Sequence, residues 1–253
     1  MAEACAVIPV FEHGDTVGRV VDCAKRCGLD VILVDDGSGA ACAQALDAIA
    51  RSDGGVHLLR HAMNRGKGAA VQSGLRHAAA LGHSHALQID ADGQHDLDDI
   101  PRFLDAARAH PDALICGSPI FGTDAPRARL YGRRLTNFWV SVHTWSAGIP
   151  DAMCGFRVYP LGTTMRLLQR GSVGCRMEFD IEILVRLHWL GVPVRWLPTV
   201  VTYPQGGTSH FRMTFDNARI ARVHTLLFIG MLARAPTLLA RRFRLTRAGG
   251  PIA

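Results

Sequence analysis

Residues 86–96 read Ala-Leu-Gln-Ile-Asp-Ala-Asp-Gly-Gln-His-Asp, an apolar run that passes directly into acidic residues. A short apolar run bounded by turn-forming residues predicts a buried strand, here Ala86–Ile89. Asp90 and Asp92 then fall at the carboxyl end of that strand. Ligands bind at the carboxyl ends of the strands in open α/β sheets. This stretch therefore indicates both a fold class and the edge of the sheet where a site is expected.

The same pattern of an apolar run followed by a helical segment extends to both sides of this stretch. We expect strands at Cys5–Val10, Val31–Val34, Val56–Leu59, Ala86–Ile89 and Ala113–Cys116, and helices at roughly Thr16–Cys27, Ala40–Arg51, Ala69–Leu81 and Asp98–Ala109. Strands that alternate with helices of this length predict an α/β fold, with a mostly parallel central sheet and helices on both faces.

The regular alternation ends after residue 117. Gly122–Arg134 predicts a loop that leads into a helix near Leu135–Ser146. Further on, we expect a strand at Cys154–Tyr159, a helix at Met177–Leu190 and an extended edge segment at Val192–Tyr203. No linker or repeat divides the chain, so we expect one domain over residues 1–212 and a C-terminal helical extension over residues 213–253.

Composition limits the class of protein. The chain has 253 residues, of which 48% are hydrophobic and 20% charged, and this balance excludes a disordered or low-complexity chain. Neither end shows the layout of a signal peptide. The cysteines number seven, form no C-x-x-C pair and have no zinc-finger spacing with histidine. These features favour a reducing, cytoplasmic compartment.

The formal charge is +6, and almost all of the positive charge is arginine, since Lys25 and Lys67 are the two lysines of the chain. Aromatic residues are sparse and no nucleic-acid-binding motif is found, which argues against nucleic acid and favours phosphorylated molecules or anionic lipid. The segment Arg219–Arg244 has a helical pattern and an apolar run at Leu226–Leu232. We expect Arg234 and Pro236 to interrupt it before it can span a bilayer. It is either an amphipathic helix on a membrane surface or a helix packed on the core.

Acidic residues follow three of the expected strands, at Glu12, at Asp35 and Asp36, and at Asp90 and Asp92. Carboxylates gathered at one edge of a sheet are costly unless they bind something, and a divalent cation and a ribose or base are natural candidates.

Asp90, Asp92 and the side chain of Gln94 form a candidate site for a hard cation, completed by water and diphosphate oxygens. The alternative is a solvated acidic loop. An EF-hand is excluded because His95 and Pro101 stand where its glycine and glutamate are required. The segment Asn64–Gly68 does not fit a Walker A motif either.

Four motifs follow one another along the chain: Val7-Ile8-Pro9-Val10, Val34-Asp35-Asp36-Gly37-Ser38, Asn64-Arg65-Gly66-Lys67-Gly68 and Asp90-Ala91-Asp92-Gly93-Gln94-His95. In this order the sequence resembles the family 2 glycosyltransferases, which have the GT-A fold, and among them the polyprenyl-phosphate sugar transferases similar to dolichyl-phosphate mannose synthase. The resemblance continues through Asp151–Arg157 and Phe179–Glu182 and weakens after residue 212.

The resemblance implies a metal-dependent, inverting transfer of a sugar from a nucleoside-diphosphate sugar to a polyprenyl phosphate or lipid-like acceptor. The enzyme would act at the cytoplasmic face of an anionic membrane. The residues implied to hold the donor are Pro9, Phe11, Glu12, Asp35, Asp36, Lys67 and Asp90. The implied ligands of Mg²⁺ or Mn²⁺ are Asp90, Asp92 and Gln94, of which Asp92 also counts as catalytic. For Asp35, a turn or N-cap role is the alternative.

The acceptor remains open at this point. Arg129 and Arg133 align approximately with positions that contact an acceptor phosphate in the family, although a serine is usual at the position of Arg133. The alternative is a solvated basic helix face. A hydroxyl of a glycan or glycolipid would need a general base, for which Glu178, Asp180 and Glu182 are available and Asp180 is preferred.

The sequence departs from the family pattern at Phe11-Glu12-His13 and within Tyr203–Arg212, where His210 or Arg212 would replace the usual basic residue. These departures leave a non-catalytic nucleotide-sugar-binding protein as the alternative of another class.

Overall fold

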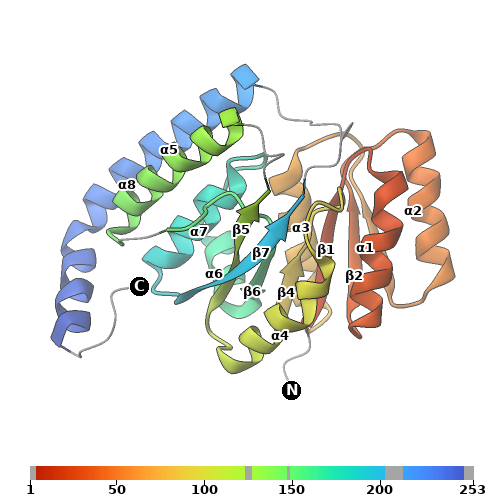
Figure 1. Ribbon diagram of the computed structural model, residues 1–253, viewed down its shortest axis with the longest axis horizontal. Helices are drawn as coiled ribbons and strands as arrows, with labels where there is room; N and C mark the ends of the chain where they lie inside the picture. Colours follow the sequence, from red (N-terminus) through yellow and green to blue (C-terminus); the bar gives the residue numbers. More distant parts are fainter. Residues whose placement is uncertain (1–3, 123–126, 147–148, 203–212, 248–253) are drawn as a thin grey trace.

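The computed structural model describes residues 4–122, 127–146, 149–202 and 213–247. Within these residues a seven-stranded sheet has the order β3-β2-β1-β4-β6-β5-β7 (Figure 1). The strands are β1 (Ala4–Val10), β2 (Asp30–Asp35), β3 (Val56–Arg60), β4 (His85–Gln88), β5 (Leu114–Phe121), β6 (Arg157–Pro160) and β7 (Val194–Val201). The helices are α1 (Gly14–Arg26), α2 (Ala40–Ser52), α3 (Lys67–Ala80), η1 (Leu97–Asp99), α4 (Ile100–Ala109), α5 (Arg127–Thr144), α6 (Leu161–Arg170), α7 (Phe179–Trp189) and α8 (Met213–Arg247).

The sheet is mostly parallel, as predicted. β3, β2, β1 and β4 run in one direction, and β7 is parallel to β5. β6 is antiparallel to both of its neighbours, β4 and β5. The carboxyl ends of β1, β2 and β4 therefore meet at one edge of the sheet, and the loops that carry the predicted site residues start there.

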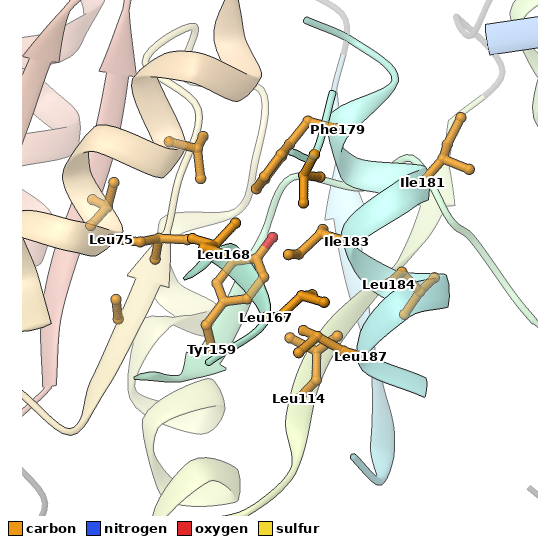
Figure 2. Packing of buried hydrophobic residues seen from close by; sticks show 14 of the residues in the cluster. Leu75, Leu114, Tyr159, Leu167, Leu168, Phe179, Ile181, Ile183, Leu184 and Leu187 are labelled. Carbon is orange, nitrogen blue, oxygen red and sulfur yellow. The ribbon is translucent and has the colours of Figure 1, made fainter. Parts of the chain in front are cut away.

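Two apolar cores hold the sheet between layers of helices, which confirms the predicted helices on both faces. Alternate residues of a strand point to opposite faces, so Val7 contributes to one core and Ile8 to the other. The first core packs α3, α6 and α7 on the sheet (Figure 2), and the second packs α1, α2 and α4 on it. Gly74 of α3 is required at this contact, because a Cβ atom there would lie 2.3 Å from Cγ1 of Val7.

Two parts of the second half differ from the prediction. Helix α5 begins at Arg127, inside the segment expected to be a loop. The sequence did not reveal this start because the first turns of α5 carry arginines and few apolar residues that would show a helical period. Helix α6 was not predicted. Its buried stripe includes Thr164, a polar residue that is 0% exposed. This residue can be buried because its hydroxyl donates to the carbonyl of Pro160 at 2.9 Å. β7 lies at the edge of the sheet, as expected from Pro193 just before it and Pro198 within it.

The C-terminal helix corrects another expectation. Helix α8 runs through Arg234 and Pro236 without a break, so the predicted interruption is wrong. A proline removes one backbone hydrogen bond and bends a helix, and here the turns on both sides keep the helix continuous. Its segment Thr214–Arg241 is long and apolar enough to cross a membrane by length and composition alone.

One face of α8 packs along α5 and α7 (Figure 1) and buries Val223, Leu227 and Met231. The opposite face leaves Leu226, Ile229 and Leu232 between 51% and 58% exposed. The helix therefore combines the packing on the core with an apolar surface that the described residues leave uncovered.

Candidate active site

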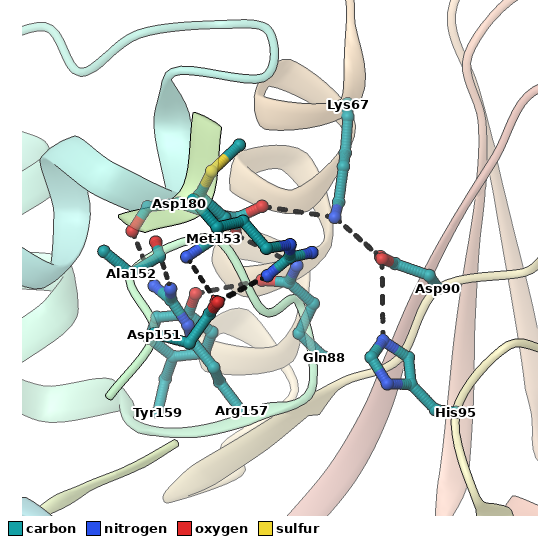
Figure 3. A network of polar contacts seen from close by, with 11 residues as sticks. Lys67, Gln88, Asp90, His95, Asp151, Ala152, Met153, Arg157, Tyr159 and Asp180 are labelled. Atoms are coloured by element: carbon teal, nitrogen blue, oxygen red, sulfur yellow. Dashed lines mark hydrogen bonds and ion pairs between the residues drawn. The ribbon is translucent and has the colours of Figure 1, made fainter. Parts of the chain in front are cut away.

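The centre of the site is an ion-pair cluster built from three elements (Figure 3). Lys67 is the first residue of α3, Asp90 follows β4, and Asp180 lies in the first turn of α7. The ammonium Nζ of Lys67 lies 2.8 Å from Oδ1 and 2.9 Å from Oδ2 of Asp90. The same nitrogen lies 3.1 Å from Oδ2 of Asp180. One lysine thus bridges two carboxylates that the sequence places far apart.

The surroundings of this cluster are tightly packed. Gly155 lies beside it, and a Cβ atom at this position would be 2.7 Å from both Nζ of Lys67 and Oδ2 of Asp90. Asp180 is 4% exposed, and its Oδ1 accepts a hydrogen bond from Nε2 of Gln88 at 3.2 Å. Burial alone would lower the pKa of Lys67, but the charges of Asp180 and Asp90 outweigh it and raise that pKa. Lys67 is therefore a charged ammonium group in the folded protein.

The two carboxylates that follow β4 have pKa values shifted in opposite directions. Burial raises the pKa of Asp90, but the charge of Lys67 and the contact with His95 outweigh burial and lower it overall. For Asp92, burial and the negative charge of Asp90 both raise the pKa. The repulsion between two half-buried carboxylates of this kind is relieved by a bound cation.

Backbone contacts fix the loop that carries these residues. The backbone N–H of Gln94 donates to Oδ1 of Asp92 at 3.0 Å, and the carbonyl of Gln94 accepts from Thr202, next to β7, at 3.0 Å. Nε2 of His95 lies 3.7 Å from Oδ2 of Asp90, and its ring stacks on Phe156 with 5.3 Å between centroids.

Residues present at this edge fit a hard divalent cation. Asp90 and Asp92 supply carboxylate oxygens, and Oδ1 of Asp90 is buried without a hydrogen bond, although it lies close to Lys67. In the part of the chain that the structure describes, no three histidine, cysteine or acidic side chains gather around one point. The remaining ligands of a cation here must therefore be amide oxygens such as that of Gln94, water or a substrate.

Asp35 and Asp36, which the resemblance assigns to the donor, are 1% and 2% exposed. Asp36 accepts hydrogen bonds from the backbone N–H groups of Arg65 at 3.0 Å and Gly66 at 2.7 Å, and Nδ1 of His61 lies 2.7 Å away. It thereby holds the loop that leads to Lys67. Sequence reasoning did not identify His61 as its partner.

Asp35 has the turn role that was its alternative. Its Oδ1 accepts from the backbone N–H of Ser38 at 2.9 Å, and its Oδ2 accepts from Nε of Arg60 at 2.9 Å. Both oxygens of this carboxylate are therefore engaged by hydrogen bonds within the protein.

The loops after β1 and β2 are joined through Glu12. Its backbone N–H donates to the hydroxyl of Ser38 at 3.2 Å, and its Oε1 accepts from the backbone N–H of Gly39 at 2.7 Å. Glu12 has φ of 59°, a conformation that non-glycine residues seldom adopt. Pro9 lies buried in β1 opposite Val34, and Phe11 is half-buried at the end of the strand. The loop after β1 and the loop after β2 are therefore held side by side through Glu12, Ser38 and Gly39.

The predicted acceptor arginines lie on α5. Nη1 of Arg133 lies 2.7 Å from Oδ1 and 2.6 Å from Oδ2 of Asp151, and its guanidinium carbon lies 5.1 Å from the ring centroid of Phe121. Arg129, one turn earlier, has an exposed side chain. The structure thus brings Arg133 against the Asp151–Arg157 segment.

Arg157 links this segment to the ion-pair cluster (Figure 3). Its side chain is 0% exposed, and its guanidinium donates to the carbonyls of Ala152 at 2.8 Å and Asp180 at 2.7 Å. This arginine belongs to the Asp151–Arg157 segment of the family resemblance, which implies no role for it. A charged residue inside an apolar run is the signal that could have identified it, because a buried arginine must be paired.

The three candidate general bases point in two directions, because residues four apart along a helix share a face, as Glu178 and Glu182 do, whereas Asp180 lies on another face. Glu178 accepts from the backbone N–H groups of Cys175 and Arg176, both at 3.2 Å, and Glu182 accepts from that of Gly174 at 2.7 Å. Asp180 instead points toward Lys67. The segment with His210 and Arg212 lies outside the described residues.

Known proteins are similar to this chain in sequence and in fold. The model of the family described as "Glycosyl transferase family 2" matches residues 5–164. The chain is 29% identical over 206 residues to a dolichyl-phosphate beta-glucosyltransferase of Dictyostelium discoideum, a match that covers 76% of this chain and 62% of that relative. It is also 29% identical over 223 residues to a polyprenol monophosphomannose synthase of Mycolicibacterium smegmatis, which covers 85% of this chain and 82% of the relative.

Among solved structures, glucosyl-3-phosphoglycerate synthase of Mycobacterium tuberculosis, crystallised with Mn²⁺, UDP-glucose and phosphoglyceric acid, has the same fold. The TM-score is 0.60 and the identity 15%, and the match covers 99% of this chain and 81% of that one. The predicted GT-A fold is confirmed, and the polyprenyl-phosphate sugar transferases are among the relatives. The chain belongs to glycosyl transferase family 2 and is a glycosyltransferase.

Proposed function

We propose that this glycosyltransferase moves a sugar from a nucleoside-diphosphate sugar to the phosphate of a polyprenyl phosphate, with inversion and with Mg²⁺ or Mn²⁺. The names of the relatives from D. discoideum and M. smegmatis support the acceptor class. The chain spans 62% of the length of the D. discoideum relative, so the acceptor class in that relative's name is carried over to this chain as a proposal.

A phosphate acceptor is supported by one observation: all three candidate general bases already have hydrogen-bond or ion-pair partners within the protein. Asp180 is paired with Lys67 and Gln88, while Glu178 and Glu182 hold the backbone of residues 174–176. A hydroxyl acceptor must lose a proton to a base as it attacks. A phosphate is already ionised and needs cationic groups to position it. Arg133 and Arg129 would supply that positive charge from α5.

For the donor, we assign Asp90, Asp92 and Gln94 to the cation. We assign the joined loops at the ends of β1 and β2, Pro9–Glu12 and Asp35–Gly39, to the base and ribose. A bound Mg²⁺ or Mn²⁺ would neutralise the charge that develops on the departing nucleoside diphosphate. Asp90 and Asp92 fit this role because both carboxylates are half-buried, and the pKa of Asp92 is raised by burial and by the negative charge of Asp90. Inversion requires the acceptor to attack from the side opposite the leaving group.

A lipid acceptor also requires contact with a membrane, which we place on the exposed face of α8 and the adjoining face of α5. Trp139 of α5 and Phe228 of α8 meet edge to face with 6.5 Å between centroids, so the two faces adjoin. The large exposed apolar side chains of this surface are Leu135, Phe138, Trp139, Leu226, Phe228, Ile229 and Leu232. With the arginines of α8, they form the composition that favours an anionic bilayer, here at its cytoplasmic face.

The test compares two acceptors that differ in one group, a polyprenyl phosphate and the corresponding polyprenol, in detergent. A panel of radiolabelled UDP- and GDP-sugars would serve as donors, and label in the organic phase would be counted. We expect transfer to the phosphate and none to the alcohol, and none with Asp92→Asn. Transfer to the alcohol alone would replace this proposal by the hydroxyl acceptor.

A further inference from the structure

Lys67 contacts both oxygens of Asp90, the carboxylate that the proposed function assigns to the metal. Its ammonium lies 2.8 and 2.9 Å from the two oxygens of this carboxylate, so it spans both of them in the way a chelated cation does. The side chain is only 19% exposed and Gly155 closes the space beside it. A positive charge of the protein therefore lies directly against a carboxylate that the proposed function assigns to the divalent cation.

We propose that Lys67 is an internal counter-ion of the metal site. It competes with the divalent cation for Asp90, and when the cation binds, Lys67 leaves Asp90 and stays paired with Asp180. This inference rests on the proposed metal role of Asp90 and Asp92. It concerns what the lysine does before the donor and the cation arrive.

The second carboxylate makes such an exchange possible. Asp180 holds Nζ of Lys67 at 3.1 Å, and its own position is fixed by Gln88 through the side chain and by Arg157 through the backbone carbonyl. When the ammonium leaves Asp90, Asp180 still pairs with it, so neither charge becomes a buried, unpaired group, which would be costly. Lys67 needs only a small displacement, because it already contacts both partners.

The charges of the cluster also balance. Asp90, Asp92 and Asp180 carry three negative charges when ionised, and Lys67 carries one positive charge, so two negative charges remain. A divalent cation neutralises these two. Without it, Lys67 reduces the repulsion between carboxylates that are held close together and largely out of water.

This competition makes cation binding weak until another anion takes the place of Asp90 beside the ammonium, which keeps its contact with Asp180. A diphosphate offers such an anion, because its oxygens accept hydrogen bonds from lysine. The site would therefore take up the cation and the donor together rather than the cation alone, which is a positive coupling between two ligands.

The experiment measures Mn²⁺ binding to the full chain without any donor, by the loss of the electron paramagnetic resonance signal of free Mn²⁺. The variant is Lys67→Met, and the control is Lys25→Met. Lys25 is the other lysine of the chain, and it pairs with Asp53 at 3.2 Å on the surface. The control therefore removes the same charge at a different place. We expect Lys67→Met to bind Mn²⁺ about tenfold more tightly than the wild type, and Lys25→Met to be unchanged.

Asp180→Asn gives the opposite expectation. With its second partner removed, Lys67 stays on Asp90, and Mn²⁺ should bind about tenfold more weakly than to the wild type. Asp180 would also attract the cation directly, so the double variant Lys67→Met with Asp180→Asn separates the two effects. If the lysine mediates the loss, replacing Asp180 costs much less affinity when Lys67 is already methionine.

A loss of the buried ion pair destabilises the variant, so thermal unfolding with and without Mn²⁺ is a second readout. Mn²⁺ should raise the unfolding temperature of Lys67→Met more than that of the wild type, because a ligand stabilises the state that binds it better. Unchanged or weaker Mn²⁺ binding by Lys67→Met would overturn the inference while leaving the metal site intact. If Asp92→Asn binds Mn²⁺ as well as the wild type does, the proposed metal site itself is wrong.

Discussion

Both carboxylate oxygens of Asp151 lie within 2.7 Å of the same nitrogen of Arg133, Nη1. Oδ1 of Asp151 also accepts from the backbone N–H of Met153 at 2.8 Å, and the carboxylate is 2% exposed. Asp151 is therefore a fixed partner that orients the guanidinium of Arg133, whose side chain is 20% exposed. An arginine held in this way is prepared for an anionic ligand without the cost of ordering a mobile side chain.

The first prediction separates the two acceptor classes. With polyprenyl phosphate and saturating metal and donor, Arg133→Ala and Arg129→Ala should each lower kcat/KM about 10- to 100-fold, since each removes hydrogen bonds to a charged group. Asp180→Asn should cost less than about tenfold under the same conditions, whereas loss of a general base typically costs about 10²–10⁴. Initial rates of sugar transfer provide the measurement.

Arg108→Ala is the matched control, because Arg108 is 61% exposed and pairs with Asp105 on α4, away from the site. Its kcat/KM should equal that of the wild type. Near-normal rates in both α5 variants, together with a severe loss in Asp180→Asn, would favour a hydroxyl acceptor.

Strands β1 and β2 could be predicted because they are buried on both faces and appear as unbroken apolar runs. β1 is buried from Cys5 to Val10, and these are the residues expected from the sequence. The helices of the second half gave a weaker signal. α5 begins with arginines, and the buried stripe of α6 contains a threonine whose hydroxyl is satisfied inside the helix.

For the site, the sequence located the carboxylates, because their order along the chain places them at the carboxyl ends of strands. It did not predict how they are paired. That Lys67 bridges Asp90 and Asp180, and that Asp36 binds the backbone before Lys67, depends on how α3 and α7 pack on the sheet. Such pairings follow from tertiary packing, which a motif in one chain does not specify.

The second prediction concerns the metal. Asp92→Asn should lower sugar transfer by at least about 10³-fold, because it removes a charged ligand from the cation that stabilises the leaving group. Circular dichroism and the unfolding temperature should remain close to those of the wild type. Asp98→Asn removes the same charge from an exposed position of the same acidic segment and should retain full activity. Full activity of Asp92→Asn, or of the wild type in excess EDTA, would disprove the metal role.

The third prediction concerns the membrane. The protein should sediment with anionic vesicles at low salt and be released as salt is raised, because salt screens attraction between exposed charges. Ile229→Glu places a charge on the apolar face of α8, where the residue is 58% exposed, and should weaken binding at least about tenfold. Deleting the chain from Arg234 onward should also weaken it.

Leu81→Glu is the control for this charge. Leu81 is 44% exposed at the end of α3 and does not belong to the α5 and α8 surface. Its vesicle binding should match that of the wild type. If the wild type fails to sediment with anionic vesicles at low salt, the membrane proposal is wrong.

The last prediction uses the two histidines that join α5 to α8. Nε2 of His143 lies 3.0 Å from Nδ1 of His224, and burial lowers the pKa of both rings, that of His143 to about 4. An unfolded chain, with a histidine pKa near 6.5, therefore binds more protons than the folded protein when the pH lies between about 4 and 6.5. The stabilising contribution of the neutral pair is complete above pH 6.5 and decreases as the pH falls toward 4.

From pH 7.5 to 5.5, His143 should account for a loss of about 1 kcal/mol in the free energy of unfolding, measured by urea unfolding with circular dichroism. His143→Gln should reduce this loss, whereas His110→Gln, at an exposed position on the end of α4, should leave it unchanged. Equal pH dependence in His143→Gln and the wild type would show that the pair is not neutral in the folded protein.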